Sequence, residues 1–275
     1  MSVKTVAIGD IGIGPGNPLI LVAGPCVIES QDIVLDTAET LCRIAEAVRI
    51  PLIFKSSYEK DNRSSADLYR GPGREGGLKI LQKVKKEFDI PVLSDVHRES
   101  DVDAAAEVLD ILQVPAFLCQ QTSLLLKIGE TGRPVNVKKG QFLDPANIKS
   151  PVGKLLAAGN DNIILTERGS CFGYNQLVVD MRSIPIMHKA GFPVLFDATH
   201  AVRVYGIPSA DPHGGQPEFV PVLARAAVAA GCDGVFLECH PNPAQARCDA
   251  ASMLELSKLE RLLRELIAIS RAVRM

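Results

Sequence analysis

The chain has 275 residues, 47% of them hydrophobic and 23% charged, and its 30 Lys and Arg against 32 Asp and Glu leave a net charge of −2. So high an apolar content with so low a net charge excludes a disordered chain, and a near-neutral balance provides no global basic field for nucleic acid. Every apolar stretch falls short of the roughly 20 residues of a membrane helix, and the first residues lack the plan of a signal peptide. We therefore expect a cytoplasmic protein that binds neither nucleic acid nor membrane, with its seven cysteines reduced.

Short apolar runs recur along the chain. They predict strands at 19–23, 51–55, 91–94, 111–114, 134–138, 163–166, 193–196 and 234–237. None of these runs alternates strictly between polar and apolar residues, which is typical of parallel strands buried on both faces. The segments between them have helical spacing, and the first, 34–48, follows Ser30, an expected N-cap.

This alternation of eight strands with helices is the pattern of an α/β protein, a (β/α)8 TIM barrel of about 250 residues. A doubly wound sheet is the alternative, although it usually has fewer strands and a Gly-rich first turn. Residues 4–18 indicate a short N-terminal β-hairpin that could close one mouth of the barrel. No linker or repeat divides the chain, so we expect one catalytic domain over 1–275.

Polar side chains gather where the predicted strands end, which is the active-site face of such a barrel. One group is cationic and is accompanied by two hydroxyls: Lys55, Lys60, Arg63, Lys138 and Arg168, with Ser64 and Ser65. Cations converging on one rim suit phosphate and carboxylate ligands. Solvated surface lysines are one alternative, and a Schiff-base aldolase, in which a strand lysine is the nucleophile, is another.

A second group combines one thiol, one imidazole and two carboxylates near the ends of the first, seventh and eighth strands. Its members are Cys26, His200, Glu238 and Asp249. Such a mixed set suits a borderline divalent ion such as Fe, Zn or Mn. No linear metal motif is present, so a buried cysteine and a hydrogen-bonded histidine remain the alternative interpretation.

Together the strand-end motifs resemble those of 3-deoxy-D-manno-octulosonate 8-phosphate (Kdo-8-phosphate) synthases from end to end. The motifs are AGPCVIES (23–30), KDNRSS (60–65), YRGPG (69–73), SDVH (94–97), QVPAFL (113–118), NVKK (136–139), ERG (167–169), FGYN (172–175), FDATH (196–200) and ECHP (238–241). The resemblance implies a C–C bond-forming transferase, 3-deoxy-8-phosphooctulonate synthase. It would condense phosphoenolpyruvate with D-arabinose 5-phosphate and water, giving Kdo 8-phosphate and phosphate for lipopolysaccharide biosynthesis. The family also implies a homotetramer.

The resemblance assigns roles to individual residues. Phosphoenolpyruvate would be held by Lys60, Lys138 and Arg168, with Lys55 close by. The pentose phosphate would be held by Asn62, Arg63 and Ser64. Catalysis would depend on Lys60, Asp95, His200 and Cys26, and which group acts as the base stays open.

Metal dependence is implied by one position. The family divides into a metal-dependent branch with cysteine in the first strand-end motif and a metal-independent branch with asparagine, and this chain has Cys26. The resemblance therefore assigns a divalent ion to Cys26, His200, Glu238 and Asp249, with Fe, Zn and Mn as candidates.

Three positions depart from the family pattern, and the first two bear on the pentose site. Gln120 stands where we expect an arginine, and Asp61 where we expect alanine. The loop at 212–217, expected to be a mobile lid, also varies. Two alternatives stay open: a 3-deoxy-7-phosphoheptulonate (DAHP) synthase using erythrose 4-phosphate, which the run at 62–65 argues against, and a non-catalytic sugar-phosphate-binding barrel.

Overall fold

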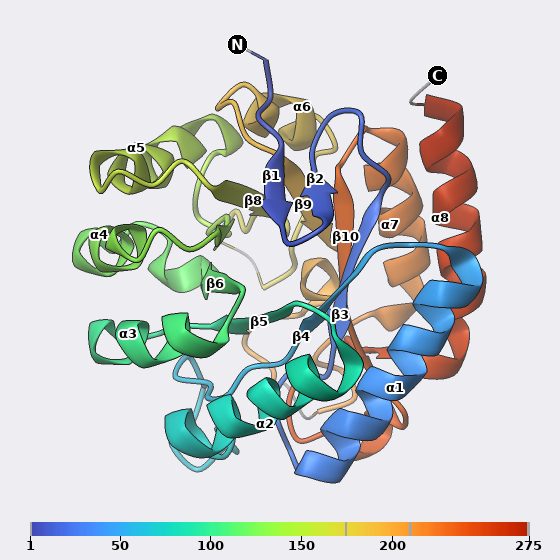
Figure 1. The fold of residues 1–275 in the computed structure, drawn as a ribbon. Coiled ribbons are helices and arrows are strands. Elements are labelled where there is room, and N and C mark those ends of the chain that lie inside the picture. The colour runs from blue at the N-terminus through green and yellow to red at the C-terminus, as the bar shows by residue number, and fades with distance from the viewer. Residues whose placement is uncertain (1, 174, 209–210, 274–275) are drawn as a thin grey trace.

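Eight parallel strands close into a barrel in the computed structural model, which describes residues 2–173, 175–208 and 211–273. The strands are β3 (Ile20–Gly24), β4 (Leu52–Lys55), β5 (Val92–Asp95), β6 (Ile111–Val114), β7 (Val135–Lys138), β8 (Ile163–Glu167), β9 (Val194–Asp197) and β10 (Gly234–His240). They pair in chain order, and β10 pairs with both β9 and β3 to close the ring. Figure 1 shows the strands inside a ring of helices, with the first two strands of the chain in front of them.

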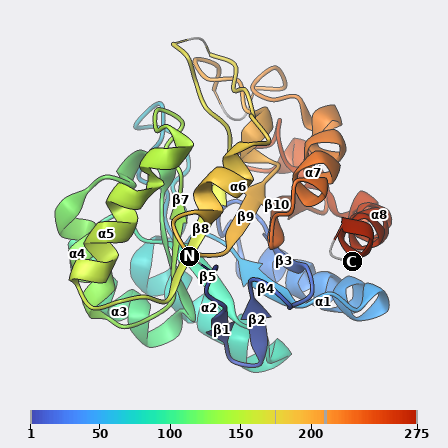
Figure 2. The same ribbon diagram turned by 90° about the horizontal axis from the view of Figure 1, so that it is seen from above.

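Helices lie on either side of the strands in the turned view, with β1 (Val6–Ile8) and β2 (Ile11–Ile13) at one end of the molecule (Figure 2). The helices are α1 (Gln31–Val48), α2 (Gly73–Phe88), α3 (Glu99–Val108), α4 (Thr122–Glu130), α5 (Lys149–Ala157), α6 (Ser183–His188), α7 (Val220–Ala229) and α8 (Leu259–Val273). Ser30 caps α1 as expected, because its Oγ accepts a hydrogen bond of 3.2 Å from the backbone N–H of Ile33. The predicted (β/α)8 barrel is confirmed, and no described helix is long and apolar enough to cross a membrane.

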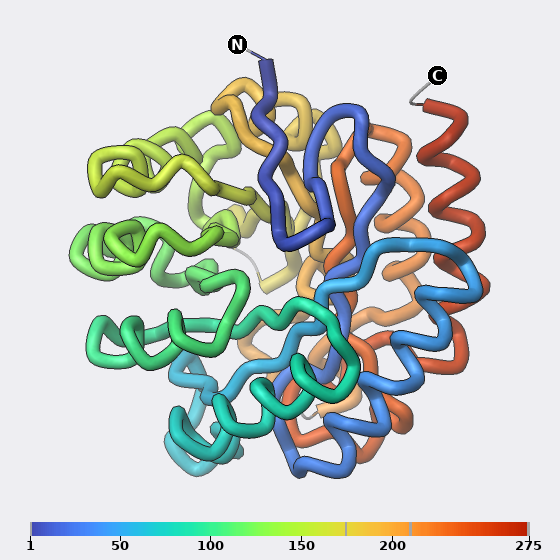
Figure 3. The backbone as a smooth tube through the Cα atoms, viewed as in Figure 1, coloured from blue at the N-terminus to red at the C-terminus, as the bar shows by residue number. Residues whose placement is uncertain are grey.

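The predicted N-terminal hairpin is also confirmed. Strands β1 (Val6–Ile8) and β2 (Ile11–Ile13) pair antiparallel. Their buried side chains pack in one apolar cluster with Ile20, Ile53 and Phe236 from the barrel strands. Because these strand residues face the barrel interior, the hairpin covers one of its ends. The chain path in Figure 3 places this hairpin beside the N-terminal end of the chain.

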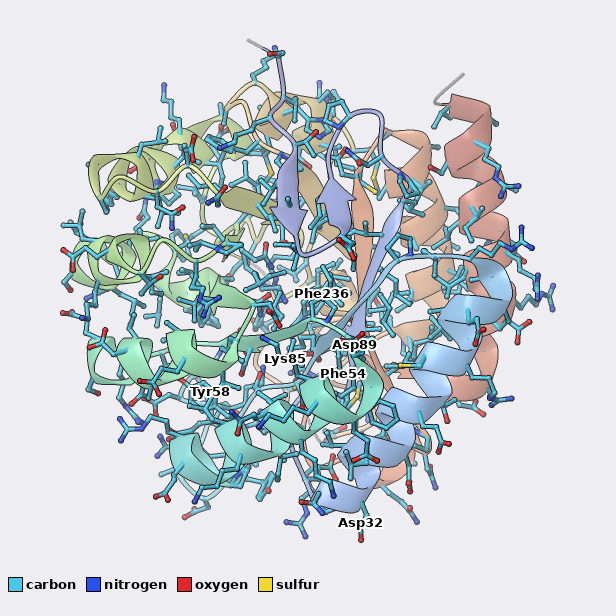
Figure 4. The ribbon with its side chains drawn as sticks, in the orientation of Figure 1. Asp32, Phe54, Tyr58, Lys85, Asp89 and Phe236 are labelled. Atoms are coloured by element: carbon cyan, nitrogen blue, oxygen red, sulfur yellow. The ribbon has the colours of Figure 1, made fainter. Side chains whose placement is uncertain are left out.

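The barrel interior has an apolar layer and a polar layer. Successive strand residues face opposite sides, so Leu93 of β5 packs in the interior cluster while its neighbour Val92 packs with the helices. Phe236, labelled near the centre of Figure 4, belongs to the same interior cluster. The next inward-facing position of β5 is Asp95, where the polar layer begins.

The last barrel strand is longer than the sequence predicts. The prediction ends at residue 237, but β10 continues to His240 because a further strand, β11 (Leu254–Glu255), pairs in parallel with Cys239 and His240. This pairing ties down the loop between the two strands, which carries Asp249. Of the FGYN motif, residue 174 lies outside the described residues.

Candidate active site and metal centre

A cavity of about 580 Å³ opens at the carboxyl ends of the barrel strands. It brings together the predicted residues Lys60, Asn62, Arg63, Ser64, Ser65, Asp95, Lys138, Arg168, His200 and Asp249. Of the charged side chains in its lining, five are Lys or Arg and two are Asp. This excess of cations suits an anionic ligand.

Lys60 and Asp95 form a buried ion pair in the cavity lining. Lys60 Nζ lies 2.8 Å from Asp95 Oδ2. Burial opposes the charge on both groups, but each partner outweighs it: the pKa of Asp95 lies well below its usual value and the pKa of Lys60 well above it. The ion pair favours the ammonium form of Lys60, which suits an anionic ligand.

Asp197 joins Lys138 to His200. Its carboxylate forms an ion pair with Lys138 and lies 2.8 Å from His200 Nδ1 through the same oxygen. Burial opposes the charged form of Asp197, but His200 and Lys138 hold its pKa below the usual value. Burial lowers the pKa of Lys138, although Asp197 works against that shift. Because His200 Nδ1 lies against Asp197, the other ring nitrogen, Nε2, faces Glu238 and Asp249.

Arg168 is buried and oriented by several acceptors. Its guanidinium donates to the Tyr205 hydroxyl and, over 3.2 Å, to the backbone carbonyl of His200. Burial opposes its charge, but Tyr205 raises its pKa overall. The backbone turn that carries it is fixed by Glu167, whose Oε1 accepts the N–H groups of Arg168 and Gly169 at 2.8 and 2.5 Å.

Lys55 lies apart from the cavity lining. It is fully buried, and its Nζ donates to the backbone carbonyl of Cys26 at 2.8 Å and to Glu238 Oε1 at 2.5 Å. The backbones of β3 and β4 come close at this point because residue 24 is a glycine: its φ is +154°, and a Cβ there would lie 2.0 Å from the Lys55 carbonyl oxygen. Lys55 therefore contacts the predicted metal ligands rather than the cavity.

The predicted metal ligands form two groups that share Asp249: Cys26 and Asp249 together with Cys248, and His200 with Glu238 and Asp249. Cys26 Sγ lies 3.2 Å from Asp249 Oδ2, and His200 Nε2 lies 3.5 Å from the same atom. His200 Nε2 is also 3.7 Å from Glu238 Oε2. Cys26 and His200 follow β3 and β9, Glu238 lies within β10, and Asp249 lies in the loop after β10; these three strands are neighbours in the closed barrel.

The chemistry of these donors fits a divalent ion. Together they offer sulfur, nitrogen and oxygen, as borderline ions prefer. Glu238 Oε2 is buried and has no hydrogen-bond donor among the described residues, so a cation would supply the partner it lacks. Burial raises the pKa of the Cys26 thiol, and Cys248, Asp249 and Glu238 raise it further. A bound cation would reverse this effect and favour the thiolate.

Several residues of the site were not predicted, among them Arg203, Tyr205 and Cys248. Arg203 and Tyr205 line the cavity, and Arg203 Nε lies 3.6 Å from Asp249 Oδ1. Cys248 Sγ lies 3.0 Å from Cys26 Sγ and accepts a hydrogen bond of 2.8 Å from Arg63 Nη1. Arg203 and Tyr205 come six and eight residues after the end of β9, beyond the strand-end positions that sequence reasoning considers. Cys248 could have been predicted as a site residue from its position directly before Asp249, a predicted metal ligand.

Comparison with known proteins identifies the family. The model of the DAHP synthetase I family matches residues 2–274. The chain is 54% identical over 271 residues to a 2-dehydro-3-deoxyphosphooctonate aldolase of Trichlorobacter lovleyi, covering 98% of this chain and 99% of the relative. Relatives with the same name from Citrifermentans bemidjiense (54% over 270 residues, 98% of each chain) and Geobacter sulfurreducens (53% over 271 residues, 98% and 99%) agree.

The chain belongs to the DAHP synthetase I family. The resemblance found in the strand-end motifs is thereby confirmed, because 2-dehydro-3-deoxyphosphooctonate is another name for Kdo 8-phosphate. The chain is an enzyme of this family, and the relatives favour the Kdo-8-phosphate branch over the DAHP alternative.

The structure explains how this member of the family accommodates Asp61. Its carboxylate forms ion pairs with Arg70 and, at 2.8 Å, with Arg98. Glu59 binds the same two arginines at 2.7 and 3.1 Å. The extra negative charge is therefore neutralised beside the cavity rather than presented to it. Gln120 is exposed and outside the cavity lining.

Proposed function

We propose that this chain condenses phosphoenolpyruvate with D-arabinose 5-phosphate and water, giving Kdo 8-phosphate and inorganic phosphate. The observation that carries the proposal is one cavity lined by five cations and two carboxylates, beside two groups of potential metal ligands that share Asp249. Two phosphorylated anions can share such a cavity because its positive charge offsets their mutual repulsion. The relatives' name specifies the eight-carbon product.

Two sets of side chains support separate places for the two substrates. Lys138 and Arg168 come from the ends of β7 and β8, with Lys60 nearby, and would hold phosphoenolpyruvate. Asn62, Arg63 and Ser64 lie on the loop after β4 and would hold the phosphate of the pentose. Lys55 would act through Glu238 rather than by touching substrate.

The reaction needs positioning more than covalent help from the protein. C3 of phosphoenolpyruvate attacks the pentose aldehyde, water adds at C2, and phosphate leaves with cleavage of its C–O bond. The cations hold the two anions face to face, which lowers the entropic part of the activation barrier of the reaction. Lys60, kept charged by Asp95, would stabilise negative charge that develops on phosphoenolpyruvate.

We infer that a divalent ion, with Fe, Zn and Mn as candidates, is held by Cys26, His200, Glu238 and Asp249. When bound, the ion would act as a Lewis acid that polarises or orients the aldehyde or the water. Asp197 fixes the ring of His200 through Nδ1, which leaves Nε2 for the ion. Lys55 offsets the negative charge of Glu238.

We further propose one catalytic domain, a homotetramer and a cytoplasmic location, as befits an enzyme acting on small phosphorylated metabolites. Large apolar side chains are exposed on loops after β6, β7 and β8: Phe117, Phe142 and Phe172, at 48, 53 and 72%. Contact between subunits would cover such a surface. The tetramer is tested by light scattering.

Phosphate release tests the proposed function. Phosphoenolpyruvate mixed with arabinose 5-phosphate should release one phosphate per condensation, whereas phosphoenolpyruvate alone should release none. Release with erythrose 4-phosphate instead would establish the DAHP alternative. No release with either aldose, together with measurable sugar-phosphate binding, would establish a non-catalytic barrel.

A further inference from the structure

A chain of hydrogen bonds crosses four adjacent strands inside the barrel and ends on Asp95. Gln113 Nε2 lies 2.5 Å from Asp95 Oδ1, Asn136 Nδ2 lies 2.7 Å from Gln113 Oε1, and Thr166 Oγ1 lies 2.7 Å from Asn136 Oδ1. The residues belong to β5, β6, β7 and β8, and Gln113 is in register with both Asp95 and Asn136. Gln113, Asn136 and Thr166 are at most 1% exposed.

We call this chain of hydrogen bonds, from Thr166 through Asn136 and Gln113 to Asp95, the ladder. The direction in which each bond is donated follows from Asp95. A carboxylate only accepts hydrogen bonds, so Gln113 must turn its amide N–H toward Asp95. Its oxygen then faces Asn136, which must donate in turn, and the oxygen of Asn136 receives the hydroxyl proton of Thr166. Each amide therefore has one allowed orientation.

The other oxygen of Asp95 points to the cavity side of the ladder. Asp95 Oδ2 accepts from Ser57 Oγ at 2.6 Å and from Lys60 Nζ at 2.8 Å. With Oδ1 held by Gln113, the carboxylate plane cannot rotate without breaking a buried hydrogen bond, and a buried amide left without a partner is costly. The position of the Lys60 ammonium is therefore coupled to strands that Lys60 does not touch.

We propose that Gln113, Asn136 and Thr166 are positioning residues that hold Asp95, and through it Lys60, in the orientation that receives phosphoenolpyruvate. This inference rests on the proposed function, in which Lys60 binds that substrate. A purely structural role predicts loss of stability alone. A positioning role also predicts lower turnover at saturating substrate and a changed chemical reactivity of Lys60.

The first test removes the far end of the ladder with little change in shape. Thr166→Val should lower kcat by about tenfold, since small displacements of a catalytic group are costly, and Thr166→Ser should restore it. Thr37→Val is the matched control, because Thr37 is a buried threonine on α1 whose hydroxyl has no hydrogen-bond partner among the described residues. It should leave kcat unchanged.

A second variant reverses one link of the ladder. Asn136→Asp keeps the shape but places an oxygen against the oxygen of Gln113, so it should reduce kcat more than Thr166→Val. The rate at which trinitrobenzenesulfonate modifies Lys60, followed by peptide mass spectrometry, measures how firmly the ladder holds Lys60 and needs no substrate. It should rise severalfold in Thr166→Val and Asn136→Asp and stay at the wild-type rate in Thr37→Val and Thr166→Ser.

The outcomes separate the two proposals. Wild-type Lys60 reactivity and wild-type kcat in folded Thr166→Val protein would overturn the positioning role, whatever the substrate. If the wild-type chain releases no phosphate but Lys60 reactivity still follows the ladder variants, the proposed function fails and the coupling of Lys60 to the ladder stands.

Discussion

Cys26 and Asp249 are 223 residues apart in the chain, yet Cys26 Sγ lies 3.2 Å from Asp249 Oδ2. The closure of β10 on β3 creates this contact, because Cys26 follows β3 and Asp249 lies in the loop that pairs back onto β10 through β11. The contact joins the two groups of potential metal ligands, since Asp249 belongs to both. The cluster thus depends on closure of the whole barrel.

Metal dependence is the first prediction. Exhaustive chelation should abolish phosphate release, and a divalent ion should restore it. Cys26→Ser should lose bound metal in elemental analysis, because a hydroxyl is a poorer ligand than a thiolate for borderline ions. Cys42→Ser, on the outer helix α1, is the matched control and should retain metal.

The Cys26→Asn variant sharpens this test. It should recover part of the turnover without metal, as the metal-independent branch of the family would suggest. Full activity of the wild-type chain after chelation, with no metal detected, would contradict metal dependence.

Lys60 is predicted to contribute to turnover through its charge. Lys60→Met should lower kcat by about 10²–10³, because it removes a charged donor aimed at the substrate. Lys79→Met is the control: Lys79 forms an exposed pair with Glu75 on α2, outside the cavity. A kcat within twofold of wild type in both variants would rule out this role for Lys60.

The Lys60–Asp95 pair should make stability depend on pH. The pKa of Asp95 is lowered in the folded chain, so the folded state binds fewer protons than the unfolded state, whose aspartate pKa is about 3.9. Its stabilisation is therefore complete above about pH 5 and is lost as the pH falls toward the folded pKa.

Urea unfolding measures this contribution. Asp95→Asn should destabilise the chain by about 3 kcal/mol at pH 7, and the difference from wild type should shrink below about pH 4. Asp103→Asn, whose exposed carboxylate pairs with Lys127, should change the free energy of unfolding by less than about 1 kcal/mol. An Asp95→Asn effect that is constant from pH 7 to pH 3 would mean that the ion pair is not its source.

Asp61 is predicted to be nearly neutral for substrate affinity. Asp61→Ala should change the KM for arabinose 5-phosphate by less than about fivefold, because Arg70 and Arg98 already compensate its charge and remain bound to Glu59. The free energy of unfolding should change by less than about 1 kcal/mol, as for other exposed pairs. A tenfold fall in KM would show that Asp61 repels the pentose phosphate directly.

Local pattern was sufficient to predict the strands, because a buried parallel strand is a short apolar run wherever it occurs. The direction of side chains within the polar layer was harder to predict. The sequence predicts Lys55 to be a cation at the rim, yet its side chain is buried and pairs with Glu238 of β10. This packing depends on the distance between strands, which composition does not reveal.

Contacts between residues far apart in the chain explain the other differences between the predictions and the structure. The end of β10 depends on its pairing with β11, and Arg203 reaches the cavity from within a loop rather than from a strand end. The ladder from Thr166 to Asp95 was also missed, since amides inside a strand read as ordinary interruptions of an apolar run. Its members become a unit only in the register of the closed barrel.

The ratio of kcat/KM for arabinose 5-phosphate to that for erythrose 4-phosphate, with the product mass measured for each, is the most direct test of Kdo-8-phosphate synthesis. We expect a ratio on the order of a hundredfold or more in favour of the pentose, with an eight-carbon sugar phosphate as the product. A ratio below one, with a seven-carbon product, would contradict the proposed function.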